Sequence, residues 1–147
     1  MNIINAQVEV LKEALKGKRK HTVMYGTLDN KVIIGNEIRL YIIPKEECAI
    51  DLTNIAGVRI LEQSILKNFV NDDECTEIEL TNDIRELHNK ITARILTNGK
   101  EKIYLDERLI KNFDLKNATF KSKGAKSIVY IYENEVMVGF CCPINVQ

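Results

Sequence analysis

The spacing of hydrophobic residues changes along the first part of the chain, from the period of a helix to that of a strand. Val8, Leu11 and Leu15 recur at intervals of three and four residues with charged side chains between them. This pattern predicts a short amphipathic helix that ends at Gly17. The residues ahead of it, NIINA, predict a short strand.

Three strands are predicted after this helix, because β-branched and aromatic residues become frequent there. The three segments are HTVMYGTL, NKVIIGN and EIRLYIIP. Two turn-forming pairs, Asp29-Asn30 and Gly35-Asn36, separate them, and Pro44 ends the run. A further strand is predicted at CAIDL.

The middle of the chain predicts one helix and two strands. Residues 59–71 return to the helical period, and their apolar side consists of Leu61, Ile65, Leu66, Phe69 and Val70. TEIELT and KITARILT alternate polar and apolar residues, as strands do. Between these two strands, residues 83–89 leave helix and loop as open alternatives.

The last third of the chain predicts the order strand, helix and three strands. The segments are KIYLD, ERLIKNFD, ATFKSKG, SIVYIY and EVMVGFCCPI. In the short helix, Leu109, Ile110 and Phe113 are expected to face inward. The last two strands are expected to form a hairpin around Glu133-Asn134-Glu135.

The first fifty residues predict this same order of elements. Leu11 and Pro44 are 33 positions apart, Leu109 and Pro143 are 34 apart, and the chain has only these two prolines. Two interpretations stay open, which are an internal duplication with half-repeats 1–55 and 100–147, and a chance similarity. The final segment EVMVGFCCP is one residue longer than EIRLYIIP, so a duplication requires a bulge in the last strand.

These patterns predict an α+β fold with antiparallel sheets and two or three short helices. A chain of 147 residues is long enough to bury one core, and no linker interrupts it, so we expect one domain over residues 1–147. The duplicated unit, where it exists, is a helix preceded by one strand and followed by three.

The charges balance overall but are unevenly distributed. Lys and Arg total 21, as do Asp and Glu, which excludes a general attraction to nucleic acid or anionic membrane. Residues 12–20 and 108–126 are basic, whereas residues 72–86 are acidic. These segments are either solvated faces or local contact surfaces.

The sequence predicts no enzyme, no metal and no cofactor. It contains no nucleophile, phosphate-binding or dinucleotide-binding motif, and His21 and His88 stand apart from any cluster of metal ligands. The adjacent Cys141 and Cys142 lie in an apolar strand, where thiols act as small hydrophobic side chains. Without a signal peptide or a membrane span, and without disulfide spacing, the chain is expected in the cytoplasm.

Four segments together resemble bacterial-type DNA sliding clamps, the processivity subunits of replicative polymerases. The ending SIVYIYENEVMVGFCCPINV is similar to the final hairpin and terminal proline motif of that family, and KIYLDERLIKNF to the strand and helix before them. INAQVEVLKEALK and NKVIIGNEIRL are similar to the family's opening elements. Clamps carry several such domains in a chain, so a single-domain relative has to assemble as a homo-oligomer to form a ring.

The resemblance implies a small, phage-type replication accessory that contacts duplex DNA nonspecifically or binds a replication protein. Helices line the hole of such a ring with basic residues, for which the candidates are Lys12, Lys16, Lys18, Arg19, Lys20 and Lys111. The partner groove beside the terminal proline implies a role for Cys141, Cys142, Pro143 and Ile144. The alternative hypothesis is a protein-binding inhibitor or adaptor that uses strand edges or the acidic segment and contacts no DNA.

Overall fold

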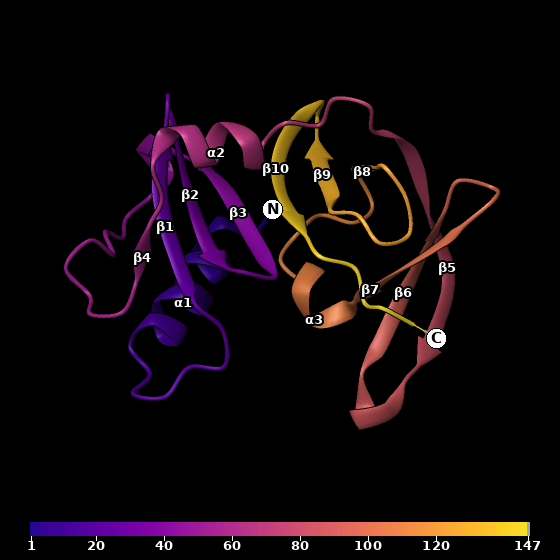
Figure 1. The fold of residues 1–147 in the computed structure, drawn as a ribbon, viewed down its shortest axis with the longest axis horizontal. Coiled ribbons are helices and arrows are strands. Elements are labelled where there is room, and N and C mark those ends of the chain that lie inside the picture. The colour runs from indigo at the N-terminus through magenta and orange to yellow at the C-terminus, as the bar shows by residue number, and fades with distance from the viewer. Residues whose placement is uncertain (147) are drawn as a thin grey trace. The chain divides into compact units, whose positions relative to one another are not determined.

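The computed structural model describes residues 1–146 and has an α+β fold with three α-helices and ten strands in that part of the chain. This confirms the predicted fold class. The chain divides into two compact units, one formed by Asn2–Asn71 and the other by Met1 with Asp72–Gln147. The elements of each unit are labelled in Figure 1. The expectation of a single domain stays a prediction.

The unit formed by Asn2–Asn71 has four strands and two helices. The elements are α1 (Ile3–Ala14), β1 (Val23–Leu28), β2 (Lys31–Asn36), β3 (Arg39–Pro44), β4 (Arg59–Ile60) and α2 (Gln63–Phe69), with a 3-10 turn at Lys45–Glu47. The strand order is β4-β1-β2-β3. All neighbours are antiparallel except β1 and β4, which are parallel.

Three strands of this unit form where the sequence predicts them. The turn between β1 and β2 is the predicted Asp29-Asn30 pair, with Asp29 at a positive φ of 52°. The turn predicted at Gly35-Asn36 is wrong, because β2 continues to Asn36 and the reversal uses Glu37 and Ile38. Gly35 is required by the close approach of β3, since a Cβ there would lie 2.2 Å from the carbonyl oxygen of Arg39.

Helix α1 exists as predicted, but its buried face and its ends differ from the prediction. The buried residues are Ala6, Gln7, Val10 and Ala14. Val8 and Leu15, two apolar positions of the predicted amphipathic pattern, are 43% and 66% exposed, and Ile4 is 74% exposed. The helix ends at Ala14 rather than at Gly17.

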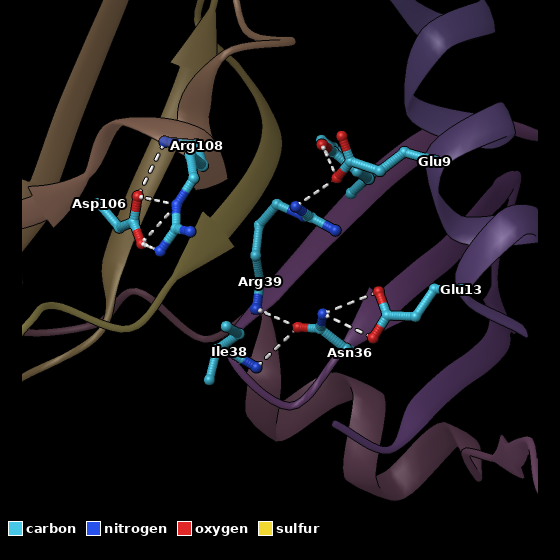
Figure 2. A network of polar contacts seen from close by, with 8 residues as sticks. Glu9, Glu13, Asn36, Ile38, Arg39, Asp106 and Arg108 are labelled. Atoms are coloured by element: carbon cyan, nitrogen blue, oxygen red, sulfur yellow. Dashed lines mark hydrogen bonds and ion pairs between the residues drawn. The ribbon is translucent and has the colours of Figure 1, made fainter. Parts of the chain in front are cut away.

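Polar side chains explain why α1 presents this face to the sheet (Figure 2). A guanidinium nitrogen of Arg39 lies 2.5 Å from Glu9, and Arg39 is only 3% exposed. The Tyr41 hydroxyl donates to Glu9 over 3.1 Å, and the Arg39 guanidinium stacks 4.4 Å from the Tyr41 ring centroid. One turn further along α1, Glu13 accepts two hydrogen bonds of 3.2 Å from the Asn36 amide. A charge as buried as Arg39 requires such a partner, which fixes the rotation of α1.

Two segments predicted as strands have other structures in the described chain. NIINA begins α1, because the side chain of Asn2 caps the helix by accepting from the backbone N–H of Asn5 over 3.0 Å. CAIDL is irregular, and the backbone at its start forms hydrogen bonds with the side-chain amide of Gln7 instead of with a neighbouring strand. This amide donates to the carbonyl of Glu47 over 3.0 Å and accepts from the N–H of Ala49 over 2.7 Å. The helix predicted over residues 59–71 is shorter, because its first residues form β4.

The unit that contains Asp72–Gln147 has six strands and one helical turn. The elements are β5 (Thr76–Glu86), β6 (Thr92–Thr97), β7 (Lys102–Asp106), α3 (Glu107–Ile110), β8 (Ala118–Ser122), β9 (Val129–Glu133) and β10 (Val136–Cys141), with a 3-10 turn at His88–Lys90. The strand order is β10-β9-β8-β5-β6-β7, and every pair is antiparallel. Its buried side chains include Ile103, Leu105, Ile110, Phe120 and Ile131.

The predicted order of the last third is confirmed. Asp106 caps α3 by accepting from the N–H of Arg108 over 2.9 Å (Figure 2), although α3 ends at Ile110 and is shorter than predicted. The β9–β10 hairpin turns at Asn134 and Glu135, both with positive φ. The register of β10 shifts between Met137 and Gly139, which is a bulge of the kind that the longer final segment requires. The segment left open, 83–89, is mostly strand, because β5 continues to Glu86.

The order of a helix followed by three antiparallel strands occurs three times along the chain. The segments are α1 with β1 to β3, α2 with β5 to β7, and α3 with β8 to β10. A strand precedes the helix in the second and third segments, namely β4 and β7. The sequence predicts a helix and strands in the middle segment as well, with residues 83–89 left open, but the repeated order is assigned only to the two ends of the chain.

Replacing Glu9 by Ala should lower the free energy of unfolding by about 3 kcal/mol, because it leaves the buried Arg39 charge without its carboxylate. The double variant Glu9→Leu/Arg39→Met should recover most of this loss, since apolar residues of similar size replace the whole pair. Urea unfolding followed by circular dichroism measures both, with the exposed Glu46→Ala as a control. A Glu9→Ala variant as stable as Glu46→Ala would contradict this role of the pair.

Candidate functional site

Five of the six predicted DNA-facing residues lie together in the unit formed by Asn2–Asn71. Lys12 is on α1, and Lys16, Lys18 and Lys20 follow the helix in the segment that leads to β1. All four lysine side chains are exposed. The structure therefore places four positive charges close in sequence at one end of α1. The sixth candidate, Lys111, follows α3 in the other unit and is also exposed.

Arg19, the fifth residue of this group, is engaged in the fold. Its guanidinium donates to the carbonyl of Ala14 over 2.5 Å and to the carbonyl of Ala56 over 2.7 Å. It thereby satisfies a carbonyl at the C-terminus of α1, where a positive charge is favourable. Gly57 leaves room for it, because a Cβ there would lie 2.7 Å from a guanidinium nitrogen. Arg19 thus links the C-terminus of α1 to the loop that precedes β4 through hydrogen bonds.

The outward side of α1 is apolar as well as basic. Ile4, Val8 and Leu15 are exposed, and the half-buried Leu11 stands between them at helical spacing. We call these four residues the α1 stripe. Lys12 stands one turn after Val8 on the adjoining side of the helix. A row of exposed large apolar side chains is typical of a protein contact rather than of a phosphate contact.

The predicted partner-groove residues are partly brought together. A hollow of about 250 Å³ is lined by Ala125, Lys126, Ile128, Cys142, Pro143, Ile144 and Asn145. We call it the C-terminal hollow. Cys141 does not line it, because that residue is buried as the last residue of β10.

Two features position the walls of the C-terminal hollow. The backbone N–H of Ile144 donates to the carbonyl of Tyr104 over 2.7 Å, so the tail is held antiparallel to β7. The opposite wall comes from residues 125–128, between β8 and β9. The sequence gives no sign of this wall, because it depends on how β8, β9 and the tail pack. A mainly apolar surface with one lysine suits an apolar side chain next to a carboxylate.

Part of the acidic segment is used within its own unit. Asp72 accepts a hydrogen bond from the Tyr132 hydroxyl, and Glu74 lies 4.0 Å from the ammonium of Lys123. Burial, followed by the interaction with Asp72, raises the pKa of Tyr132 far above its usual range. Burial also raises the pKa of the nearby Cys75 thiol, which disfavours its reactive thiolate.

The described residues contain no cluster of His, Cys, Asp and Glu that would hold a metal ion, and no disulfide joins the four cysteines. No helix within residues 1–146 is both long and apolar enough to cross a membrane. No family model, no curated protein and no solved structure matches this chain.

The raised pKa of Tyr132 predicts a loss of stability at alkaline pH. The unfolded chain ionises its tyrosines near pH 10, whereas the folded state keeps Tyr132 neutral. The stability is thus unaffected well below about pH 10 and falls above it, by about 1 kcal/mol per pH unit for this group. Tyr132→Phe removes the ionising group and should reduce this slope in urea unfolding between pH 8 and about 11.

The slope should not vanish in this variant, because burial raises the pKa of Tyr130 and Tyr25 too. The half-buried Tyr104 supplies the matched control Tyr104→Phe. If the unfolding free energy of Tyr132→Phe fell with pH as steeply as that of the wild type, the fold would not favour the neutral form of Tyr132.

Proposed function

We propose that this protein is a clamp-like DNA replication accessory of the kind that a phage or mobile element encodes. It assembles with further copies of itself, contacts duplex DNA without reading sequence, and binds a replication protein. The observation that carries this proposal is the threefold occurrence of a helix followed by three antiparallel strands. The resemblance of the chain's two ends to sliding clamps rests on this same order of elements.

The DNA contact is assigned to exposed lysines at the end of α1. Nonspecific binding requires positive side chains near phosphates and no contact with base edges. Lys16, Lys18 and Lys20 extend beyond the helix in a segment without carboxylates, and Lys12 lies one turn before them. Arg19 is excluded from this role, because its guanidinium donates to backbone carbonyls. Lys111, which follows α3 in the other unit, is a separate candidate for a DNA contact.

The C-terminal hollow is the proposed contact for the replication protein. Cys142, Pro143 and Ile144 supply its apolar wall, and Lys126 supplies a positive charge at its border. A short peptide with an apolar anchor and a carboxylate matches both features. Cys141 contributes to the core of its unit rather than to this contact.

A protein-binding adaptor without DNA contact is the second candidate, and the α1 stripe favours it. Three of the exposed large apolar side chains lie along one side of α1, directly beside Lys12. Such a surface is expected to meet another protein. In the first candidate the lysines at the end of α1 contact DNA, whereas in the second they do not. A DNA-binding measurement distinguishes the two.

Duplex DNA retention should fall steeply with salt concentration in the wild-type protein, because phosphate contacts release counterions. The variant with Gln at Lys12, Lys16, Lys18 and Lys20 should bind more weakly, and each lost phosphate contact should lower the salt slope by about 0.9. Fluorescence anisotropy with a duplex of mixed sequence measures the slope, and mass photometry measures assembly.

The matched control replaces four other exposed lysines, Lys45, Lys67, Lys100 and Lys102, by Gln. It removes the same charge and should keep the wild-type slope. A protein that is monomeric and does not bind duplex DNA would contradict the clamp-like proposal and favour the adaptor. An equal loss in both variants would assign DNA binding to net charge alone.

A further inference from the structure

Strand β5 pairs with two different neighbours along its length. Its ladder with β8 covers three pairs, Thr76–Ser122, Glu77–Lys121 and Ile78–Phe120. Its ladder with β6 begins at the next residue, Glu79, and continues to Glu86, with a register shift between Leu80 and Ile84 that leaves residues 81–83 outside the ladder. The strand therefore leaves β8 at Ile78 and continues as part of a sheet with β6 and β7.

Two strand edges diverge from the Ile78–Phe120 pair. In the described chain, β5 forms no ladder with β8 beyond that pair, and Ala118 and Thr119 of β8 are paired with β9 on their other side. An edge of this kind presents backbone N–H and C=O groups that can pair with another extended chain. We call the region between these two edges the fork.

The fork is hollow. A cavity of about 1140 Å³ is lined by both edges, and also by Arg94, the turn after β6 and the loop before β8. Its lining includes Glu77, Ile78, Glu79, Leu80, Arg94 and Phe120. All of them belong to one compact unit. The space is large enough for a peptide segment.

The strand registers place apolar and charged side chains on one face of the fork. Directly opposite residues in a ladder share a face, and so do residues two apart in a strand. Ile78 is opposite Phe120, Leu80 is opposite Leu96, and Arg94 is two residues from Leu96 in β6. Leu80, Phe120 and Arg94 therefore lie on the same face.

Arg94 has an unsatisfied donor in this cavity. Its Nε atom is buried and has no hydrogen-bond partner among the described residues. A buried donor without an acceptor is unfavourable. Arg94 also lines the cavity, and a guanidinium forms strong, charge-assisted bonds with a carboxylate from outside the chain. The lining carries two carboxylates, Glu77 and Glu79, besides Arg94 and Lys116. This balance repels the many phosphates of a nucleic acid more strongly than the single carboxylate of a peptide side chain.

We propose that the fork binds an extended segment of a partner protein by strand addition. The segment pairs with the open edge of β5 at residues 79–82, places an apolar side chain against Leu80 and Phe120, and presents Asp or Glu to Arg94. Because side chains alternate along a strand, the acidic residue stands two positions from the apolar one. This site goes beyond the proposed function, since it uses neither the lysines of α1 nor the C-terminal hollow.

Selection of phage-displayed random peptides on the full chain tests this site. The enriched peptides should carry Asp or Glu two positions from a large apolar residue. Synthetic versions, measured by fluorescence anisotropy, should bind Arg94→Gln about tenfold more weakly than the wild-type protein. The control is Arg85→Gln. Arg85 pairs with Ala93 on the other face of β5, and its guanidinium lies 5.7 Å from the Tyr104 ring centroid. This variant should bind within about twofold of wild type.

A second comparison keeps the test valid should Arg94→Gln fail to fold. Replacing the acidic residue of the peptide by its amide should weaken binding to the wild-type protein about tenfold, a measurement that requires no variant of the chain. Where Arg94→Gln folds, the amide should have no further effect on its binding. Hydrogen exchange should show new protection at residues 79–82 and 118–119 when the peptide binds.

Three results would overturn the proposal. They are the absence of enriched peptides, binding that is insensitive to both substitutions, and protection confined to the C-terminal hollow. Displacement of the peptide by duplex DNA would assign the fork to nucleic acid instead. Loss of DNA retention in the lysine variant is measured separately, so failure of this site and failure of the proposed function are distinguishable.

Discussion

The ion pair between Glu9 and Arg39 determines which side of α1 meets the sheet. Arg39 is buried on β3, so its charge needs a carboxylate from the helix that covers it. Glu9 supplies it from the border of the buried side of α1, with Ala6, Val10 and Ala14 facing inward. The larger residues of the α1 stripe then face solvent together with Lys12. Both the DNA-binding proposal and the adaptor alternative depend on this rotation.

The sequence predicts the elements of this helix and its sheet better than it predicts their orientation. β-Branched residues and the Asp29-Asn30 turn are sufficient to place β1 to β3, because these signals are local. The face of α1 is different. Val8, Leu11 and Leu15 give a stronger hydrophobic pattern than the small residues that are buried, so periodicity favours the wrong side. The buried face of α1 depends on a long-range ion pair with a residue of β3, and the local spacing of hydrophobic residues does not indicate such a pair.

The same distinction applies to the candidate sites. Three partner-groove residues, Cys142, Pro143 and Ile144, are adjacent in sequence, and they line one hollow in the structure. The wall opposite them and the whole fork are missed. Each is assembled from segments far apart in the chain, such as Ile78 and Phe120. The helix and strands of the middle segment are predicted, but their order is not recognised as a repeat, because β4 is only two residues long and residues 83–89 have helical spacing although most of them are in a strand.

The fork follows from how two three-stranded segments are joined. β5 and β8 are the first strands of successive segments, and each continues into its own antiparallel meander, β5-β6-β7 and β8-β9-β10. Within residues 1–146, the ladder pairs between the two meanders are the three between β5 and β8. Strands in a sheet rotate by about 20° relative to their neighbours, so two meanders that twist separately diverge beyond a short joint. The backbone edges of the fork thus arise from the order of elements, whereas Arg94 and Leu80 determine which peptide the fork selects.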